Sequence, residues 1–262
     1  MAEAAVGFMP TFPDLTGKVA VVTGGSKGIG AATCRMLAGN GAKVAVNGRE
    51  PAGIDGVVAG LLESGAAAIG VSADCTRFAE IERMREQVER ELGPTDVLIA
   101  FAGGFATFSA VHETSEEEWH AVVESNLTAT FLTIKSFLPG MIERRRGAIV
   151  TMASNAGRFL DMKLTASYAA AKAGIVMLTR HVALEVAQYG VRVNCVAPAT
   201  VRSERVDRIM SPQRQAEVAQ MSPLGRMGLP DDVAAATLFL ASESASWMTG
   251  VTVDVAGGRI MM

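Results

Sequence analysis

Two side chains four residues apart, Tyr168 and Lys172 in the stretch S-Y-A-A-A-K-A-G, form a pair that can do chemistry. Positions i and i+4 of a helix lie on one face, so the phenol and the ammonium would share one small volume. A phenol has an ordinary pKa of about 10 and is a poor acid or base at neutral pH. A neighbouring ammonium favours the phenolate and lowers that pKa, which suits the pair to general acid–base catalysis. Ordinary surface pairs have the same spacing, so the spacing alone does not decide between the two interpretations.

A glycine-rich stretch near the N-terminus predicts a dinucleotide site. T-G-G-S-K-G-I-G spans residues 23–30, after the apolar run 18–23 and before a stretch of helix-forming residues. Glycines let the backbone approach a pyrophosphate, and the first turn of a helix favours negative charge. The glycine spacing departs from the more general G-x-G-x-x-G, and an ordinary tight connection also uses such glycines. The strand–turn–helix context favours the cofactor interpretation.

The end of the second predicted strand bears on which dinucleotide binds. A carboxylate there would bond the free 2′-hydroxyl of NAD and repel the 2′-phosphate of NADP. This chain has Asn47-Gly48-Arg49 at that point, no carboxylate before Glu50, and Lys27 within the glycine-rich turn. The two cations favour a phosphate, and we therefore predict NADP(H) in preference to NAD(H). The alternatives are that Arg49 is a solvated loop residue and that Glu50 bonds the ribose.

The elements that would position these residues alternate along the chain. Short apolar runs predict strands, and amphipathic stretches between them predict helices. The strands are expected at 18–23, 43–47, 67–72, 96–100, 147–152, 191–196 and 251–255, and the helices at 31–38, 77–92, 115–142, 165–189 and 230–242. This alternation indicates an α/β fold, a single-domain doubly wound parallel sheet of the Rossmann type with about seven strands and helices on both faces. Ligands of such sheets bind beyond the carboxyl ends of the strands.

Length and composition restrict the other possibilities. We expect a loose N-terminal arm over residues 1–14, one domain over 15–262, and a polar, irregular, lid-like segment over 199–228. The 262 residues are 49% hydrophobic with a net charge of −3, which indicates a globular chain without a basic surface for nucleic acid. No apolar run reaches transmembrane length. Three widely spaced cysteines and the absence of a signal-peptide pattern predict a reduced, cytoplasmic protein, and no metal-binding pattern is present.

Together these motifs resemble those of the short-chain dehydrogenase/reductases. The likeness runs from about residue 15 to residue 258 and rests on T-G-G-S-K-G-I-G, Asn126, Ser154, Y-A-A-A-K, V-R-V-N-C-V-A-P and T-G-V-T-V-D-V-A-G-G. The nearest branch by appearance is that of the 3-oxoacyl-[acyl-carrier-protein] reductase-like ketoreductases. The resemblance implies an NAD(P)-dependent alcohol dehydrogenase or carbonyl reductase that passes hydride between the nicotinamide and a carbonyl carbon.

The resemblance also implies roles for individual residues. Tyr168 would be the acid or base, Lys172 would lower its pKa and bond the nicotinamide ribose, and Ser154 would polarise the substrate carbonyl. Asn126 would fix a water of a proton relay, and Asp74 would bond the adenine amino group. The remaining cofactor-binding positions that it implies are Gly24, Ser26, Lys27, Gly28, Ile29, Gly30, Arg49, Cys75, Ala102, Gly103, Pro198, Ala199, Val201 and Ser203.

Four departures from the family pattern make the substrate less certain while keeping every catalytic group. The usual N-N-A-G is replaced by residues 100–103, A-F-A-G, and we expect Phe101 to pack against the long helix 115–142. The other three departures are Pro198-Ala199 for the usual P-G, Ser203 for the usual Thr, and one more residue between Ser154 and Tyr168 than in the acyl-carrier reductases.

The substrate is expected in a pocket bounded by 104–108, 155–165 and 199–228. A lining rich in Met and Phe suits a bulky apolar ketone, although some of these residues would belong to the core instead. The candidates are Phe105, Phe108, Phe159, Leu160, Met162, Leu164, Met210 and Met221. Arg158, Arg202 and Arg205 would meet an anionic substrate or carrier, or cap helices.

Three functions are open at this point. We favour a ketoreductase of fatty-acid, polyketide or secondary metabolism that acts on a free or carrier-bound carbonyl or alcohol. The second is an NAD-dependent dehydrogenase of a sugar, steroid or cyclic alcohol. The third, a non-catalytic nucleotide-binding protein, is disfavoured by the intact set of Asn126, Ser154, Tyr168 and Lys172. The resemblance further implies a homotetramer in which the helices 115–142 and 165–189 meet their copies, with no nucleic-acid or membrane partner.

Overall fold

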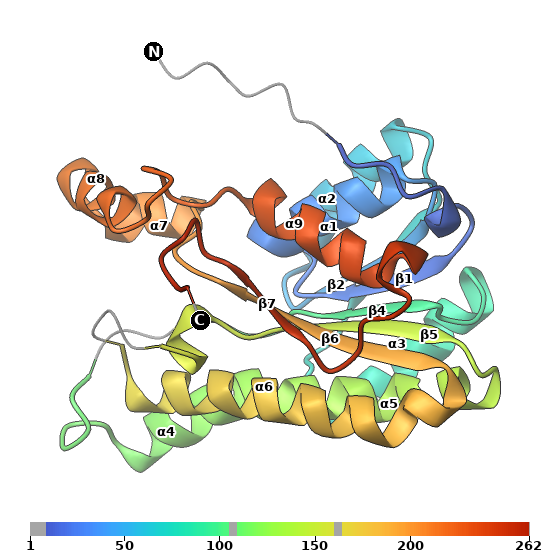
Figure 1. The fold of residues 1–262 in the computed structure, drawn as a ribbon. Helices are drawn as coiled ribbons and strands as arrows, with labels where there is room; N and C mark the ends of the chain where they lie inside the picture. The colour runs from blue at the N-terminus through green and yellow to red at the C-terminus, as the bar shows by residue number, and fades with distance from the viewer. Residues whose placement is uncertain (1–8, 105–108, 160–163, 262) are drawn as a thin grey trace.

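The computed structural model describes residues 9–104, 109–159 and 164–261, and a sheet of seven parallel strands runs through this part of the chain (Figure 1). The strands are β1 (Val19–Thr23), β2 (Lys43–Gly48), β3 (Ala68–Ser72), β4 (Val97–Ala100), β5 (Gly147–Met152), β6 (Val191–Pro198) and β7 (Thr252–Val255). They lie in the order β3-β2-β1-β4-β5-β6-β7, with parallel pairing throughout. The predicted fold class is confirmed.

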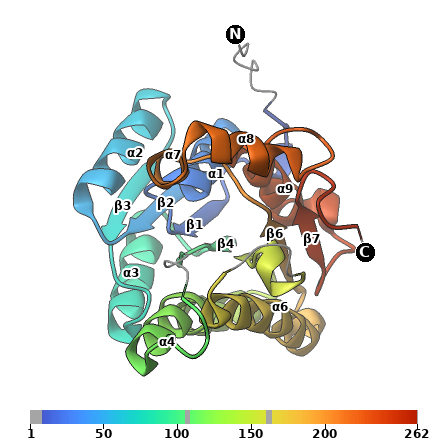
Figure 2. The ribbon, with the colours of Figure 1, turned by 90° about the vertical axis from the view of Figure 1, so that its left-hand side faces the viewer.

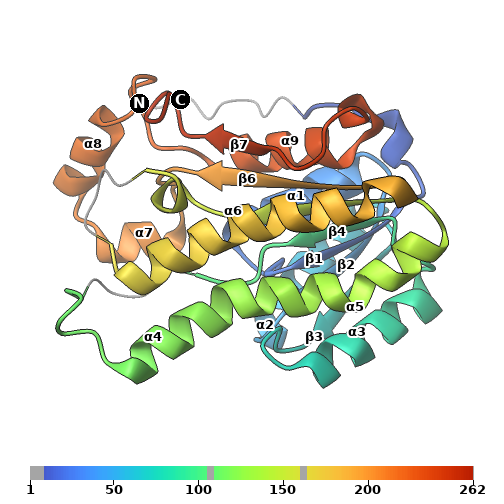
Figure 3. The same cartoon turned by 60° about the horizontal axis from the view of Figure 1, so that its bottom comes forward.

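Helices cover both faces of this sheet, as Figures 1 and 3 show. One face carries α1 (Gly28–Gly39), α2 (Pro51–Glu63) and α9 (Pro230–Ala241), and the other carries α3 (Phe78–Glu91), α5 (Ala129–Glu143) and α6 (Ala166–Val186). α4 (Glu116–Val123) continues into α5 through a π turn, Glu124–Thr128. Short 3-10 turns lie at Pro13–Leu15 (η1), Asn155–Gly157 (η3), Ala187–Tyr189 (η4) and Glu243–Ala245 (η5). Among the described helices, none has both the length and the hydrophobicity needed to cross a membrane.

The core divides into two layers because successive strand residues point to opposite faces. In β1, Ala20 and Val22 belong to the layer with α1 and α9, whereas Val19 and Val21 belong to the layer with α3 and α5. Phe101, directly after β4, is buried in the α1–α9 layer. The expectation that Phe101 packs against the helix 115–142 is therefore wrong, because that helix lies on the opposite face.

Several elements differ from those expected. α2 occupies residues 51–63, for which the sequence patterns predict no element. The segment 199–228, expected to be irregular, contains α7 (Glu204–Ile209) and α8 (Pro212–Gln220). The two helices follow Ser203 and Ser211, whose hydroxyls accept hydrogen bonds from the backbone N–H groups of the first turns. These serines are ordinary N-cap residues, which explains why polar segments of this kind become helical.

Part of the expected N-terminal arm is attached to the body. The Asn40 side chain accepts a hydrogen bond from Phe12 N at 2.6 Å and donates one to Pro10 O at 3.1 Å. The Asp14 carboxylate accepts from Glu243 N at 2.9 Å. From Pro10 to Asp14 the chain is thus held against α1 and η5, contrary to the expectation of a loose arm. Residues 1–8 lie outside the described part.

Candidate active site

The sheet order places the topological switch point between β1 and β4, where the connections leave in opposite directions, and a doubly wound sheet has its ligand crevice at such a point. Ligands of doubly wound sheets bind at this point, beyond the carboxyl ends of the strands. Figure 2 looks onto these strand ends, with α7 and α8 above them and α4 and the start of α6 below. The glycine-rich turn follows β1, and Ala102 and Gly103 follow β4, so both predicted cofactor segments lie at this crevice.

The glycines of the turn are required by close backbone approaches. A Cβ on Gly24 would lie 2.8 Å from Phe101 O, and one on Gly30 would lie 2.1 Å from Gly24 O. Gly28, with a φ of +56°, begins α1 and has no atom within 4 Å of where its Cβ would be. The backbone is thus exposed to open space at the first turn of a helix, as an approaching pyrophosphate requires. Lys27 precedes that turn with an exposed side chain that makes no capping hydrogen bond.

Thr23 joins the two cofactor segments across the crevice. Its hydroxyl accepts hydrogen bonds from Phe101 N at 3.0 Å and from Ala102 N at 3.1 Å. Gly103 then passes directly over Asn126, because a Cβ there would lie 2.6 Å from Asn126 Oδ1. The A-F-A-G segment is therefore fixed by groups from β1 and from the π turn, although it lacks the asparagines usual at this position.

Two loops lie next along the crevice. The loop after β2 carries Arg49, and the loop after β3 carries Asp74. The buried Asn47 side chain donates to Val71 O and Ala73 O, each at 3.1 Å, and accepts from Cys75 Sγ at 3.3 Å. A hydrogen bond from Thr76 N, together with the charge of the exposed Arg49, lowers the pKa of the Asp74 carboxyl. Asp74 and Arg49 thus lie close together at this rim. Cys75 is buried, and its hydrogen bond to Asn47 connects the loop after β3 to the end of β2.

Asn126 lies inside the π turn and is fully buried. Its side chain accepts from Gly104 N at 3.1 Å and donates to Gly104 O at 3.0 Å and Val122 O at 2.9 Å. Its own carbonyl accepts a hydrogen bond from Thr130 Oγ1. A π turn is a frequent feature of functional sites, and here it brings a polar side chain to the segment after β4.

Lys172 and Tyr168 are next to each other in α6, with Lys172 Nζ 5.6 Å from the centroid of the Tyr168 ring. The lysine is 3% exposed, and its ammonium donates to Met152 O at 2.9 Å. Burial lowers the pKa of Lys172 to about 8. At neutral pH the amine therefore still carries its charge beside the half-buried phenol.

Ser154 follows β5 and caps the turn η3. Its hydroxyl accepts from Ala156 N and donates to Asn155 Oδ1, each at 3.2 Å. Gly157, at the end of η3, lies directly on α6, because a Cβ there would be 2.5 Å from the carbonyl carbon of Lys172. The structure thus brings the Ser154 segment and the Lys172 turn of α6 into contact.

The residues expected near the nicotinamide lie where β6 leaves the sheet. Pro198 ends the strand, and Ala199 N donates to Val255 O at 3.3 Å. Val201 pairs with Gly228 in an isolated parallel bridge, so the two ends of the segment that carries α7 and α8 lie side by side. Ser203 caps α7 through Val206 N at 3.2 Å, so its hydroxyl already has a partner.

The candidates for the substrate pocket separate into three groups. Phe105, Phe108, Leu160, Met162 and the side chain of Arg205 lie outside the described part. Phe159 is 51% exposed and Met221 37% exposed, while Leu164 and Met210 are half-buried, so none of these four is a core residue. Arg158 forms an ion pair with Asp254 at 2.8 Å, and Arg202 one with Asp207 at 3.5 Å, so each already has a carboxylate partner.

Three contributions to the site were missed from the sequence. They are the Thr23 hydroxyl, the contact of Gly157 with α6, and Thr165, which caps α6 by accepting from Tyr168 N at 3.3 Å. A Thr three residues before Tyr168 is a recognisable N-cap signal. The other two depend on packing between distant segments and have no local signal.

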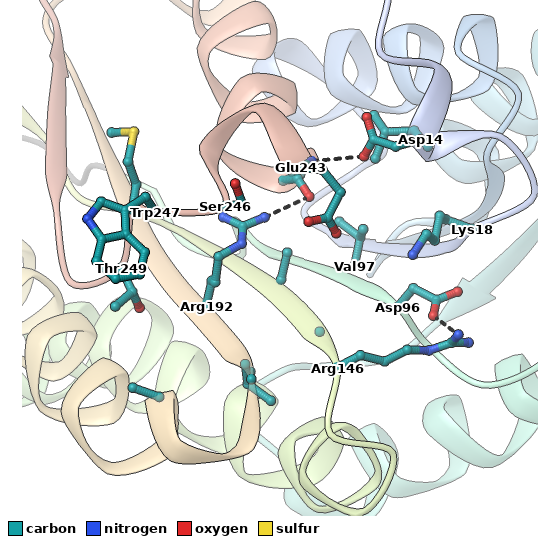
Figure 4. Close-up of a pocket in the computed structure, with 18 residues that line it drawn as sticks. Asp14, Lys18, Asp96, Val97, Arg146, Arg192, Glu243, Ser246, Trp247 and Thr249 are labelled. Carbon is teal, nitrogen blue, oxygen red and sulfur yellow. Dashed lines mark hydrogen bonds and ion pairs between the residues drawn. The ribbon is translucent and has the colours of Figure 1, made fainter.

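A separate cavity of about 480 Å³ lies at the opposite, amino-terminal edge of the sheet (Figure 4). Arg192 points into it from the start of β6 and donates to the carbonyls of Leu240, Ala241 and Ser242, which end α9. Asp96 and Arg146 form an ion pair beside it at 3.0 Å. Arg192 is thus bonded to carbonyls at the end of α9 and Arg146 to Asp96, and none of the predicted site residues lines this cavity.

The residues at the carboxyl edge fit a dinucleotide. The turn offers an open backbone at Gly28, the rim after β2 and β3 offers Arg49 and Asp74, and α6 offers Lys172. An extended cofactor laid along this edge would meet first the rim with Arg49 and Asp74, then the turn at the start of α1 with its pyrophosphate, and last Lys172.

Comparisons with known proteins agree with this architecture. A model of the short chain dehydrogenase family matches residues 18–214. The chain is 38% identical over 249 residues to the 3-oxoacyl-[acyl-carrier-protein] reductase FabG of Vibrio cholerae, a match that covers 95% of this chain and 100% of the relative. It is 43% identical over 223 residues to the inactive 2-(S)-hydroxypropyl-CoM dehydrogenase 2 of Xanthobacter autotrophicus, covering 83% and 95%.

A solved structure gives the same result. The crystal structure of a 3-oxoacyl-[acyl-carrier protein] reductase from Brucella melitensis with bound NAD is similar, with a TM-score of 0.91 and 30% identity over 100% of this chain and 99% of the other. These matches span nearly the whole chain. The chain belongs to the short-chain dehydrogenase family.

Proposed function

We propose that this short-chain dehydrogenase reduces a ketone to a secondary alcohol, or catalyses the reverse oxidation, with NADP(H) as its hydride carrier. The observation that carries the proposal is the buried, charged Lys172 beside Tyr168, in contact with the segment that begins at Ser154. NADP(H), when bound, supplies or accepts the hydride.

Each catalytic group has one task in this proposal. Ser154 donates its hydroxyl hydrogen to the carbonyl oxygen and polarises it, exchanging its present bond to Asn155 for one to the substrate. Tyr168 donates a proton to the same oxygen as negative charge develops on it, and Lys172 stabilises the phenolate that remains. Lys172 is suited to this because its ammonium has three N–H donors, and the hydrogen bond to Met152 O uses one of them, which leaves donors for a ribose.

The preference for NADP(H) is supported by the end of β2. A Cβ at Gly48 would lie 2.8 Å from Ser26 Oγ, so a carboxylate side chain at this position is excluded unless Ser26 moves. Arg49 follows with an exposed guanidinium, and the exposed Lys27 lies in the adjacent turn. These groups are the Ser26 hydroxyl and the cations of Lys27 and Arg49, and no carboxylate lies among them. Such a set favours the 2′-phosphate of NADP(H).

Two observations favour the alternative of an NAD-dependent dehydrogenase. The similar Brucella melitensis reductase was crystallised with NAD, and Glu50 follows Arg49 directly in this chain. A panel of 3-oxoacyl thioesters, bulky ketones and secondary alcohols, assayed with both cofactors, separates the two. Oxidation of a sugar or cyclic alcohol with NAD, without reduction of any thioester by NADPH, would reject the ketoreductase.

Two variants test the proposal at its centre. Tyr168→Phe should bind NADPH as the wild type does and lose about 10²- to 10⁴-fold in kcat. Unchanged turnover in that variant would exclude the phenol from the reaction. Arg49→Asp should weaken NADPH much more than NADH, while Arg83→Asp, which changes an exposed charge on α3, should affect neither. Equal losses of affinity for NADPH and NADH in Arg49→Asp would show that Arg49 does not bind the 2′-phosphate.

We also propose that the protein is a cytoplasmic homotetramer. Three unpaired, buried cysteines suit a reducing compartment. The outer sides of α5 and α6 expose Phe131, Met177 and Leu184 by 46%, 60% and 82%, an apolar surface that a second copy would cover. Light scattering on the wild type and on Leu184→Asp tests this assembly. A monomeric wild type, or a tetramer indifferent to the substitution, would contradict it.

A further inference from the structure

An ion pair joins two segments beside the candidate active site that are far apart in the sequence. Arg158 Nε lies 2.8 Å from Asp254 Oδ1, and the two side chains are only 16% and 19% exposed. Neither of these two atoms has a hydrogen-bond partner within the described part of the chain, so the ion pair is what compensates their burial. Removing one member of such a pair leaves the other buried and uncompensated, which is much more damaging than the loss of a surface pair.

The pair lies on the same side of the sheet as Tyr168 and Lys172. Asp254 is the third residue of β7, and it stands opposite Ala197 in the pairing of β6 with β7. Val253 and Val255 on either side of it pack into the α1–α9 layer, whereas Ala197 packs with Ile175 of α6. Since side chains alternate along a strand, Asp254 points to the α6 side.

Arg158 reaches this position from the segment that carries Ser154. That segment leaves β5, and β7 is two strands away in the sheet, with β6 between them. The residues between Ser154 and Arg158 therefore span the end of β6, with Gly157 pressed against the backbone of Lys172. η3 is held at three places: the end of β5, the first turns of α6, and β7 through the ion pair.

We propose that Arg158 and Asp254 are positioning residues, which fix the far end of η3 so that the Ser154 hydroxyl faces the substrate carbonyl. The inference rests on the proposed carbonyl chemistry for its consequence, but the anchoring itself does not. Burial raises the pKa of Asp254, and the charge of Arg158 opposes that change. The assignment also explains why Arg158 is not free to bind an anionic substrate.

The test compares Asp254→Asn, which keeps the shape of the side chain and removes its charge, with the wild type. Kinetics with NADPH and a ketone should give a kcat/KM lower by about 10²-fold, because small misplacements of a catalytic group have effects of this size. The loss should appear in kcat, and NADPH affinity should be unchanged because the cofactor residues lie elsewhere. Hydrogen exchange should become faster at the amides of Ala156 and Phe159, which η3 now protects.

Further variants distinguish positioning from general destabilisation. Asp254→Glu should recover part of the lost activity, and the double variant Arg158→Gln with Asp254→Asn should lose no more than the single one, since the pair acts as a unit. Glu89→Gln breaks an ion pair of 2.7 Å on α3, remote from the site, and should change neither exchange at η3 nor kcat. Should Asp254→Asn not fold, Arg158→Lys, which keeps the charge but loses the planar fork, is measured in the same way.

The outcomes separate the two proposals. Unchanged exchange at residues 155–159 in Asp254→Asn would overturn the anchoring, and faster exchange with wild-type kcat would overturn its role in positioning Ser154. A wild type that binds NADPH but reduces no ketone would refute the proposed function, while the exchange data would still decide whether the ion pair holds η3.

Discussion

The burial of Lys172 predicts a pH dependence of stability that needs no substrate to measure. The lysine is 3% exposed, and burial lowers its pKa from 10.5 to about 8. In the unfolded chain the pKa returns to its ordinary value, so folding at neutral pH places a charge where it is less favourable than in water. Lys172→Met removes the charge and keeps most of the side-chain volume.

The sign and the size follow from proton linkage. Above pH 10.5 the amine is neutral in both states and has no effect. Between pH 10.5 and pH 8 the unfolded chain binds a proton that the folded chain does not, so stability falls as the pH is lowered through this window. Below pH 8 both states are protonated and the loss is complete. A difference of 2.5 pKa units corresponds to about 3 kcal/mol.

The assay is urea unfolding without nucleotide at several pH values between 7 and 10.5. Burial also raises the pKa values of Cys34, Cys75 and Cys195, and these thiols make the folded state less stable as the pH rises. They are present in both proteins, so their effects largely cancel in the difference between wild type and Lys172→Met. We expect the wild type to gain about 3 kcal/mol relative to the variant from pH 7 to pH 10.5.

A flat difference over this range would refute the reasoning. It would mean that the amine is solvated in the folded protein, or that a nearby anion compensates its burial. In either case the amine would still be charged at neutral pH beside Tyr168, and the argument that burial lowers its pKa would fail. Lys43→Met, which removes a half-buried lysine at the start of β2, is the matched control for the Lys-to-Met substitution itself.

Three further substitutions test the packing around the site by chemical unfolding. Thr23→Val leaves the amides of Phe101 and Ala102 without their acceptor and should lower stability by about 1–3 kcal/mol for each amide, with weaker NADPH binding; full stability would show that water replaces the hydroxyl. Gly157→Ala places a methyl group 2.5 Å from the backbone of Lys172 and should lower stability by about 1–3 kcal/mol and reduce kcat, a prediction that an unaltered kcat contradicts. Phe101→Asn, which introduces the residue usual in the family, should destabilise by about 3–5 kcal/mol, and a neutral effect would mean that Phe101 is not a core residue.

The strands and the main helices were predictable because their signals are local. Val19–Thr23 is apolar up to its last residue, and Val191–Pro198 is apolar except for Arg192 and Asn194, as expected for strands covered on both faces. α6 and α9 have good helix formers and clear ends. α9 ends one residue before its predicted bound, and α6 ends at Val186, where the 3-10 turn η4 continues to the predicted end at Tyr189.

The missed helix α2 shows where local signals fail. Its sequence begins with a proline and contains Gly53, Gly56 and Gly60, a composition with low helix propensity. Pro51 is nevertheless at the first helical position, where its ring is tolerated, and Ile54 and Leu61 are buried against the sheet. Packing of two apolar side chains on one face outweighs the cost of the glycines, and no pattern over 48–66 reveals that partner.

The altered A-F-A-G segment illustrates the same limit at the site itself. The sequence shows that two asparagines are missing after β4, which would suggest a weakened crevice. In the structure the hydroxyl of Thr23 binds two amides of this segment, and the buried amide of Asn126 binds both backbone groups of Gly104. Phe101 turns into the α1–α9 layer and adds apolar burial there. The backbone groups of this segment are thus satisfied from β1 and the π turn, so the substitution changes how the crevice is held and gives no reason to expect an inactive site.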